Sequence, residues 1–234
     1  MEGADWFGRR PAGLQLHFHD EAQVSVIWNG HRDYRIGSRS VRLRPGQLLI
    51  IPGLRPHLAL PSMDDEVQSV EFYLAPAALS VEAQRRLDSS QFMIIEHSLI
   101  EHAVPQGIAE LALECVTNRL VSSNQPATPP MFTPAKTDFR ETATASDGIS
   151  DAARRFGYTR EGFIRAFARE IGMTPNAYKI NRRLNLGRQL LRKGESISEV
   201  AHETGFSDQS HFGRAFLRHF GATPGQFRAA HCRR

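Results

Sequence analysis

The most constraining feature of this sequence is an internal repeat in its last third. The segment FIRAFAREIGMTPNAY, residues 163 to 178, recurs as FGRAFLRHFGATPGQF, residues 212 to 227, at an offset of 49 residues. The match extends upstream, where Ile149-Ser150-Asp151 is answered by Ile197-Ser198-Glu199 at an offset of 48. The identical positions within the two segments are Phe163/Phe212, Arg165/Arg214, Ala166/Ala215, Phe167/Phe216, Arg169/Arg218, Gly172/Gly221, Thr174/Thr223 and Pro175/Pro224. We therefore expect two copies of one helical unit.

Each copy has the order of elements found in a helix-turn-helix. A short amphipathic helix (150–156 and 198–204) is followed by a glycine, Gly157 or Gly205, which can take the left-handed backbone conformation of a tight turn. Thr159 and Ser207 follow as candidate N-caps of the second helices. The pattern predicts helix-turn-helix units at about 150–170 and 198–220.

The second helix of each unit separates an apolar face from a polar one. Phe163/Phe167 and Phe212/Phe216 are spaced i, i+4 and should face the core. The residues between them face outward and suit base reading, because Arg can donate to guanine and Gln to adenine. Two alternatives remain: the copies form a bundle or protein-interaction repeat, or Arg165 and Arg214 hold phosphate or a carboxylate. The candidate DNA-binding residues are Thr159, Arg160, Glu161, Ile164, Arg165, Gln209, Ser210, His211, Gly213 and Arg214.

A helix at about 176–193 should join the two units and hold them one DNA turn, ~34 Å, apart. Its four arginines (182, 183, 188 and 192) are expected to face phosphate or solvent. The distribution of charge along the chain agrees with a nucleic-acid partner. Residues 1–135 contain 11 Lys/Arg and 15 Asp/Glu, whereas residues 136–234 contain 18 and 10, so the net charge of +4 hides a basic C-terminal part.

The region from Leu14 to Leu74 consists of short alternating blocks broken by turn residues, which predicts a β-sandwich or small barrel. Within it, Asn29-Gly30 is predicted to turn a tight hairpin that pairs Val24/Val26 with Tyr34/Ile36. An apolar stripe over 107–122 predicts a helix that packs on the β domain or on a second copy. We divide the chain into an effector-sensing and dimerisation domain (1–124), a Pro-rich linker (125–134) and a helical domain (135–234).

Cysteine and hydropathy patterns point to a cytoplasmic protein. Cys115 and Cys232 are far apart and lack metal-ligand spacing, so neither a disulfide framework nor a zinc finger is expected. The longest apolar run, 48–51, ends at Pro52 and is too short to span a membrane.

Residues 149–230 resemble the DNA-binding domain of AraC/XylS-type transcription regulators, most clearly in GFSDQSHFGRAFLRHFGATPGQFR. The resemblance implies a two-domain α+β chain: a cupin-like β-barrel followed by helices, then an all-α double helix-turn-helix domain. It also implies promoter DNA, a small-molecule effector, RNA polymerase and a second copy of the chain as partners, activator function, and no cofactor. The sequence departs from the family in residues 135–146, which offer little to bury where a helix is expected, and in Gly162 within the first reading helix.

Residues 14–75 resemble the cupin-like sensor domain of such regulators, through HFHDE (17–21) and RPGQLLIIPGLRPH (44–57). His17, His19 and His57 fit the histidines of a cupin metal set. Gln23 and Val24 stand where its glutamate belongs, although Glu21 is close, so we expect no metal. The alternative role of these histidines is to line an effector pocket or to bond within the core; the candidate effector-binding residues are His17, His19, Trp28, Tyr34 and His57. Two other functions compete: a cupin-type oxygenase or isomerase, and a non-specific architectural DNA binder.

Overall fold

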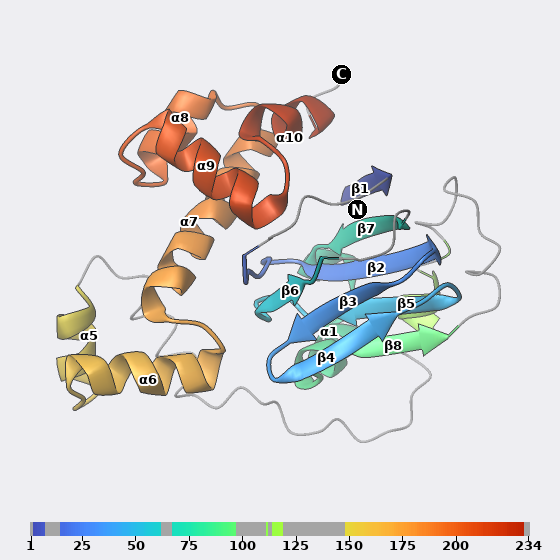
Figure 1. The fold of residues 1–234 in the computed structure, drawn as a ribbon, viewed down its shortest axis with the longest axis horizontal. Helices are drawn as coiled ribbons and strands as arrows, with labels where there is room; N and C mark the ends of the chain where they lie inside the picture. The colour runs from blue at the N-terminus through green and yellow to red at the C-terminus, as the bar shows by residue number, and fades with distance from the viewer. Residues whose placement is uncertain are drawn as a thin grey trace. The chain divides into compact units, whose positions relative to one another are not determined.

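The computed structural model describes residues 2–7, 15–61, 67–96, 111, 114–118 and 148–231. The chain divides into two compact units, of which the first contains Phe18–Phe132 and the second contains Thr133–Arg234 together with Leu14–His17 (Figure 1). The Pro-rich segment 125–134 and the segment 135–146 lie outside the described residues. Among the helices that are described, none is both long and apolar enough to cross a membrane.

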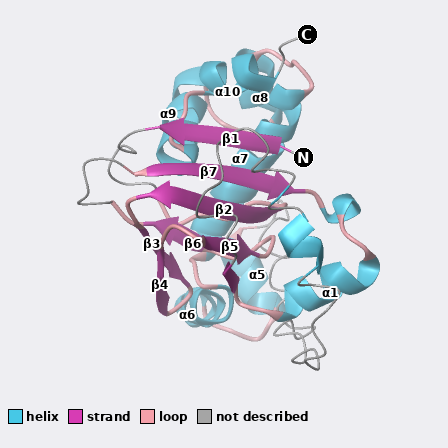
Figure 2. Ribbon diagram, turned by 90° about the vertical axis from the view of Figure 1, so that its right-hand side faces the viewer, coloured by secondary structure: helices cyan, strands magenta, loops and turns pink. Residues whose placement is uncertain are grey.

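The larger sheet of the first unit is antiparallel and has five strands in the order β1-β7-β2-β5-β8. Figure 2 shows β1, β7 and β2 side by side. The strands are β1 (Glu2–Phe7), β2 (Ala22–Asn29), β5 (Gln47–Ile51), β7 (Gln68–Leu74) and β8 (Met93–Glu96). The β-rich fold predicted from the turn spacing, which the family resemblance describes as cupin-like, is confirmed, although the described strands form two sheets and no single closed barrel.

The smaller sheet corrects the predicted hairpin. It consists of β3 (Arg32–Ile36), β4 (Arg39–Leu43) and β6 (His57–Ala59) in the order β4-β3-β6. Gly30 has a φ of 76°, as a tight turn requires, but β2 pairs with β5 and β7 whereas β3 pairs with β4 and β6. The Asn29-Gly30 prediction of a hairpin was therefore wrong: this turn carries the chain from one sheet to the other, which local alternation cannot distinguish from a hairpin.

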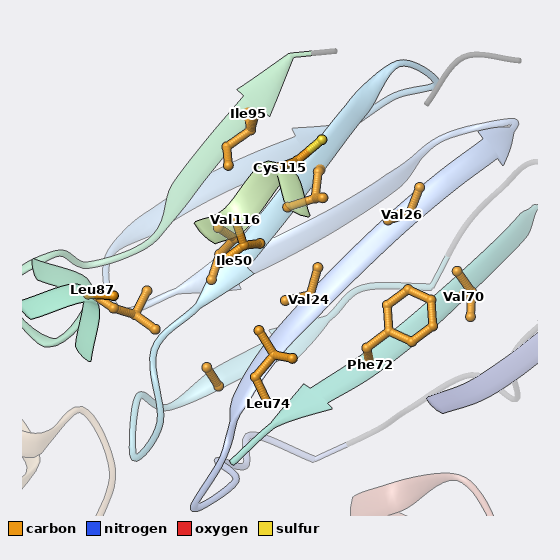
Figure 3. Close-up of a cluster of buried hydrophobic side chains, with 13 residues drawn as sticks. Val24, Val26, Ile50, Val70, Phe72, Leu74, Leu87, Ile95, Cys115 and Val116 are labelled. Carbon is orange, nitrogen blue, oxygen red and sulfur yellow. The ribbon is translucent and has the colours of Figure 1, made fainter. Parts of the chain in front are cut away.

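Alternation along the strands gives the large sheet two different faces. Val24 and Val26 of β2 lie in one cluster with Val70 and Phe72 of β7, covered by Leu87 of α1 (Val81–Ser89) (Figure 3). Cys115 and Val116, which lie in a helical stretch within the predicted 107–122 helix, join this cluster. Residues of opposite parity point to the other face, and four of them are polar yet buried: Gln23, Ser25, Ser69 and Glu71.

The second unit is helical over its described residues. It contains α5 (Ile149–Arg155), α6 (Arg160–Ile171), α7 (Pro175–Arg192), α8 (Ile197–Glu203), α9 (Gln209–Phe220) and α10 (Pro224–His231). Both second helices end at a left-handed glycine, Gly172 with φ 92° and Gly221 with φ 73°. Pro175 then occupies the first turn of α7, where its missing N–H leaves no helical hydrogen bond unmade. The repeat thus gives two helix-turn-helix units, α5–α6 and α8–α9.

The paired phenylalanines form the core of each unit, as predicted. Phe163, Phe167, Phe212 and Phe216 are all 0% exposed. Around Phe216 the core adds rings from later in the chain, since Phe220 lies 4.7 Å and Phe227 5.5 Å from it between ring centroids. These contacts fix the rotation of α9 about its axis and therefore decide which residues face outward.

Candidate nucleic-acid interface

The N-terminus of α6 is held by the cap that the sequence predicted. Thr159 Oγ1 accepts a hydrogen bond from the backbone N–H of Gly162 at 3.1 Å. Arg160, Glu161 and Arg165 are exposed beyond it, while Ile164 is half-buried. Because the inner side of the helix is closed by phenylalanines, these residues form an outward row within reach of a ligand.

Gly162 has a structural reason to be in this helix. A Cβ at this position would lie 3.0 Å from Thr159 Oγ1, tighter than ordinary contact. The capping hydroxyl therefore takes the space that a side chain would need. The glycine lowers the intrinsic helix propensity of α6 but leaves room for the hydrogen bond between Thr159 Oγ1 and the Gly162 N–H.

The N-cap of α9 is Asp208, so the prediction of Ser207 was one residue early. Asp208 Oδ1 accepts from the backbone N–H of His211 at 2.7 Å. Ser207 Oγ supports this carboxylate, lying 3.0 Å from Asp208 Oδ2 and 3.1 Å from His211 Nδ1. The backbone bond from His211, followed by the Ser207 hydroxyl, lowers the pKa of Asp208. Sequence alone could not decide between two adjacent residues that both make good caps.

The outward face of α9 is more open than that of α6. Gln209, Ser210, His211 and Arg214 are exposed, and a Cβ added at Gly213 would meet no atom within 4 Å. His211 is nevertheless positioned, because its ring packs edge-on against Phe206 with centroids 5.2 Å apart. Every predicted position of the second unit therefore lies on one outward helical face, with His211 the most constrained.

The arginines of α7 do not all behave as predicted. Arg188 is 2% exposed and its guanidinium carbon lies 5.2 Å from the Phe220 ring centroid and 5.7 Å from that of Phe227. Arg192 lies 5.9 Å from the same Phe227 ring, and burial lowers its pKa. The expectation of phosphate or solvent contact was wrong for Arg188, and Arg192 is only partly exposed, because these guanidinium groups pack on aromatic faces contributed by α9 and α10.

Arg183 supports the second turn from α7. Its Nη1 donates to the Gly205 carbonyl at 3.1 Å, and its guanidinium would lie 3.4 Å from a Cβ at that glycine. Figure 1 shows α7 running between the α5–α6 pair and the α8–α9 pair. An 18-residue helix is about 27 Å long, close to the ~34 Å between successive major-groove faces of a duplex.

The β unit brings some of the predicted effector residues together. His19 and His57 are buried with ring centroids 5.3 Å apart, whereas His17, also buried, belongs to the second compact unit. Tyr34 is fully buried, with its hydroxyl 3.5 Å from Glu71 Oε1. Trp28 is not with them, since it packs on the apolar cluster of Val24 and Val26 and donates to Gln68 Oε1 at 2.8 Å.

Sequence reasoning missed a buried ion pair on the same sheet face. Arg32 Nη1 and Glu71 Oε1 are 3.7 Å apart with side chains 3% and 2% exposed. Arg32 Nη1 and the Ser69 hydroxyl have no hydrogen-bond partner. A charged residue at an inward-facing strand position was the available signal, but finding it needed the register of β3 and β7.

Comparisons with known proteins agree with this organisation. Residues 152–230 match a family described as a helix-turn-helix domain, and residues 12–122 match the AraC-like ligand binding domain. The virulence regulon transcriptional activator VirF of Yersinia enterocolitica is 41% identical over 81 residues, which is 34% of this chain and 30% of VirF. The regulator ExsA of Pseudomonas aeruginosa is 38% identical over 34% of this chain and 29% of its own. The similarity thus spans about a third of each of these relatives' lengths.

A solved structure extends the likeness to the whole chain at the level of fold. ToxT of Vibrio cholerae superimposes with a TM-score of 0.59 and 10% identity, covering 99% of this chain and 98% of ToxT. A second ToxT structure, with an unsaturated fatty acid bound, gives a TM-score of 0.58 and 12% identity over 97% of this chain and 93% of ToxT. With both domain types matched in this order, the chain belongs to the AraC family of transcription regulators.

Proposed function

We propose that this chain binds promoter DNA sequence-specifically through α6 and α9 and regulates transcription in response to a small molecule. One observation carries the DNA-binding part. In both copies of the repeat, the phenylalanines at i, i+4 are fully buried while the polar residues between them are exposed. A helix held in this way can enter a major groove without unfolding its own core.

The outward residues have distinct proposed roles. Arg165 and Arg214 occupy equivalent positions and are suited to donate in a fork to guanine O6 and N7. Gln209 is suited to pair with adenine N6 and N7, and Arg160 lies at the equivalent position of the first unit. Thr159, Glu161, Ile164, Ser210, His211 and Gly213 complete the proposed contact surface. Since Arg160 and Gln209 differ at equivalent positions, the two units would read different half-sites.

The first unit is the proposed effector domain. Its match to an AraC-like ligand binding domain supports this role, and ToxT, which shares the fold, has been solved with a fatty acid bound. We propose His19, Tyr34 and His57, with Arg32 and Glu71, as the effector-facing groups of this unit. Effector binding would alter DNA affinity only through a difference in effector affinity between two states. Homodimerisation, contact with RNA polymerase, activation and a cytoplasmic location belong to the same proposal.

Fluorescence anisotropy with labelled duplexes tests DNA reading directly. The protein would be titrated, at ~150 mM salt, into labelled duplexes taken from the DNA upstream of its own gene and into scrambled duplexes of equal length. We expect one fragment to bind at least about 1000-fold more tightly than scrambled DNA. Equal affinity for both would reject sequence-specific reading and leave non-specific binding, which would show as a steep salt dependence without a preferred site.

A matched set of arginine variants assigns the contacts. Arg214→Ala should lower affinity about 10- to 100-fold and relax the preference at one base pair, following a loss of about 1–3 kcal/mol of discrimination. Arg85→Ala, which removes an exposed arginine of α1, controls for the change in charge. A uniform loss over all sequences in Arg214→Ala would instead assign that residue to phosphate.

A further inference from the structure

The ring of His211 is held at the start of α9 by contacts on two sides. His211 lies in the first turn of the helix, shortly after the N-cap Asp208. Its Nδ1 lies 3.1 Å from Ser207 Oγ, and its ring packs edge-on against that of Phe206, with centroids 5.2 Å apart and ring planes at 83°. The side chain is exposed beyond these contacts. One ring nitrogen therefore faces Ser207, and the other, Nε2, is available to a ligand.

The Ser207 hydroxyl has one proton and two neighbours that could take it. Its Oγ lies 3.0 Å from Asp208 Oδ2 and 3.1 Å from His211 Nδ1. An aspartate at neutral pH is ionised and only accepts hydrogen bonds, and the bonds described above lower the pKa of Asp208 further. The hydroxyl therefore donates to Asp208, which leaves a lone pair of Ser207 Oγ facing His211.

This lone pair selects one tautomer of the His211 ring. If Nδ1 also carried a lone pair, two acceptors would face each other at 3.1 Å, so Nδ1 carries the proton and donates to Ser207 Oγ. In a neutral imidazole one nitrogen is a donor and the other an acceptor. The outer nitrogen, Nε2, is therefore an acceptor, and among the described residues it has no hydrogen-bond partner.

An acceptor at this position matches few groups in a major groove. The N-terminal residues of a recognition helix are the ones that contact base edges. The groove offers hydrogen-bond donors only at the N4 amino group of cytosine and the N6 amino group of adenine, whereas guanine presents the acceptors O6 and N7. Phosphate oxygens also only accept. A neutral His211 with its lone pair on Nε2 thus complements cytosine or adenine, the opposite of what Arg214 on the next turn complements.

The first helix-turn-helix has no counterpart of this arrangement. At the 49-residue offset of the repeat, Gly162 stands where His211 stands in the second unit. The Thr159 hydroxyl before it accepts from the Gly162 N–H and has no imidazole to orient. The oriented acceptor is therefore a property of α9 and adds to the difference between the two reading helices.

From these contacts we infer that Ser207, itself oriented by Asp208, holds His211 in the Nδ1–H tautomer, so that His211 Nε2 accepts a hydrogen bond from the amino group of cytosine or adenine. The inference rests on the proposed reading of DNA by α9 and names the kind of base that one of its residues reads. In it His211 is the specificity-determining contact, and Ser207 is a positioning residue that acts through the ring.

Nuclear magnetic resonance of the full-length chain with 15N-labelled histidine tests the tautomer without DNA. At a pH of about 8, where histidines are ordinarily neutral, the signals lost in His211→Ala should show a protonated Nδ1 and an unprotonated Nε2. Ser207→Ala should move the ring toward the Nε2–H tautomer, which is preferred by a free histidine side chain. Ser198→Ala, at an exposed serine of α8, is the matched control and should change nothing. A wild-type ring protonated on Nε2, or the same tautomer in Ser207→Ala, would overturn the inference.

Fluorescence anisotropy at the same pH tests the base preference. Duplexes that carry each of the four base pairs in turn along the bound fragment should show one position at which cytosine or adenine is favoured about 3- to 10-fold over guanine and thymine, the worth of one neutral hydrogen bond. The four arms also separate cytosine from adenine.

The two variants then assign that preference. His211→Ala should lose it, and Ser207→Ala should shift it toward guanine or thymine, because an Nε2–H donates. Sequence-specific binding with an unchanged base profile in His211→Ala would reject the inference alone, whereas absence of any specific binding by the wild type would reject the proposed function as well.

Discussion

Gly187 in α7 offers a sharp test of how the second helix-turn-helix is built. A Cβ at this position would lie 2.8 Å from Phe212 Cε2, 2.9 Å from Phe212 Cζ and 3.4 Å from Val200 Cγ1. The Phe212 ring cannot move freely, because it is fully buried between Phe206 and Phe216, whose centroids are 5.3 and 5.5 Å away. We therefore expect Gly187→Ala to overpack the core of this unit.

Two opposing effects set the size of the change. Replacing a helix-interior glycine by alanine gains about 0.5–1 kcal/mol from backbone entropy and propensity. Inserting a methyl group into a packed core costs about 1–3 kcal/mol. The difference predicts a net loss of about 1 kcal/mol in the free energy of unfolding of the helical unit, with the Phe212 ring displaced by a few tenths of an ångström.

Gly213→Ala is the matched control, since it adds the same atom to a helix at a position with nothing within 4 Å. It should stabilise the unit by about 0.5–1 kcal/mol. Urea unfolding followed by circular dichroism at 222 nm compares the two variants with the wild type. Stabilisation of Gly187→Ala by as much as Gly213→Ala would refute the argument that this glycine is required by the close approach of α7 to Phe212.

Substitutions at three further residues of the helical unit test its packing, capping and pH dependence. Phe216→Ala should cost about 3–5 kcal/mol in urea unfolding, because it leaves a cavity among buried rings; an unchanged midpoint would contradict the burial of this residue. Thr159→Ala should cost about 1 kcal/mol by removing the α6 cap, whereas Thr159→Ser should retain most of it; equal losses would exclude the cap. Burial lowers the pKa of His219 from 6.5, so the unfolded state binds more protons below that value and stability should fall as the pH drops from about 6.5. His219→Gln should reduce that slope in a pH series of thermal melts, and an unchanged slope would assign it to other groups.

The repeat made the helical unit predictable in detail. Identical residues in two copies fixed the inward phenylalanines, the glycine turns and the outward rows, because each follows from helical periodicity within a short segment. The predictions that were wrong in the helical unit concerned features that depend on tertiary contacts. In the sequence Arg188 cannot be distinguished from a surface arginine, because the rings of Phe220 and Phe227 that cover it come from other helices. Asp208 rather than Ser207 is the N-cap because of the residue at which α9 begins.

The β unit was predictable in class but not in pairing. Alternating strands and turns are local features, whereas the choice between a hairpin and a crossing to a second sheet at Gly30 depends on which strands lie nearby. The histidines could be named from their motif, yet the 2.9 Å contact between Gln23 Oε1 and His57 Nε2 is visible only in the structure. Arg32 and Glu71 lie 39 positions apart in the sequence, so neither local segment predicts that they form an ion pair.

The N-cap residues of α6 and α9 also differ in charge. Thr159 places a neutral hydroxyl at the start of α6, whereas Asp208 places a carboxylate, kept ionised by its bonds to His211 and Ser207, at the start of α9. A fixed negative charge there is repelled by every sugar–phosphate strand, whatever its sequence. In the proposed DNA complex, docking of α9 would therefore carry a penalty that well-matched base contacts offset.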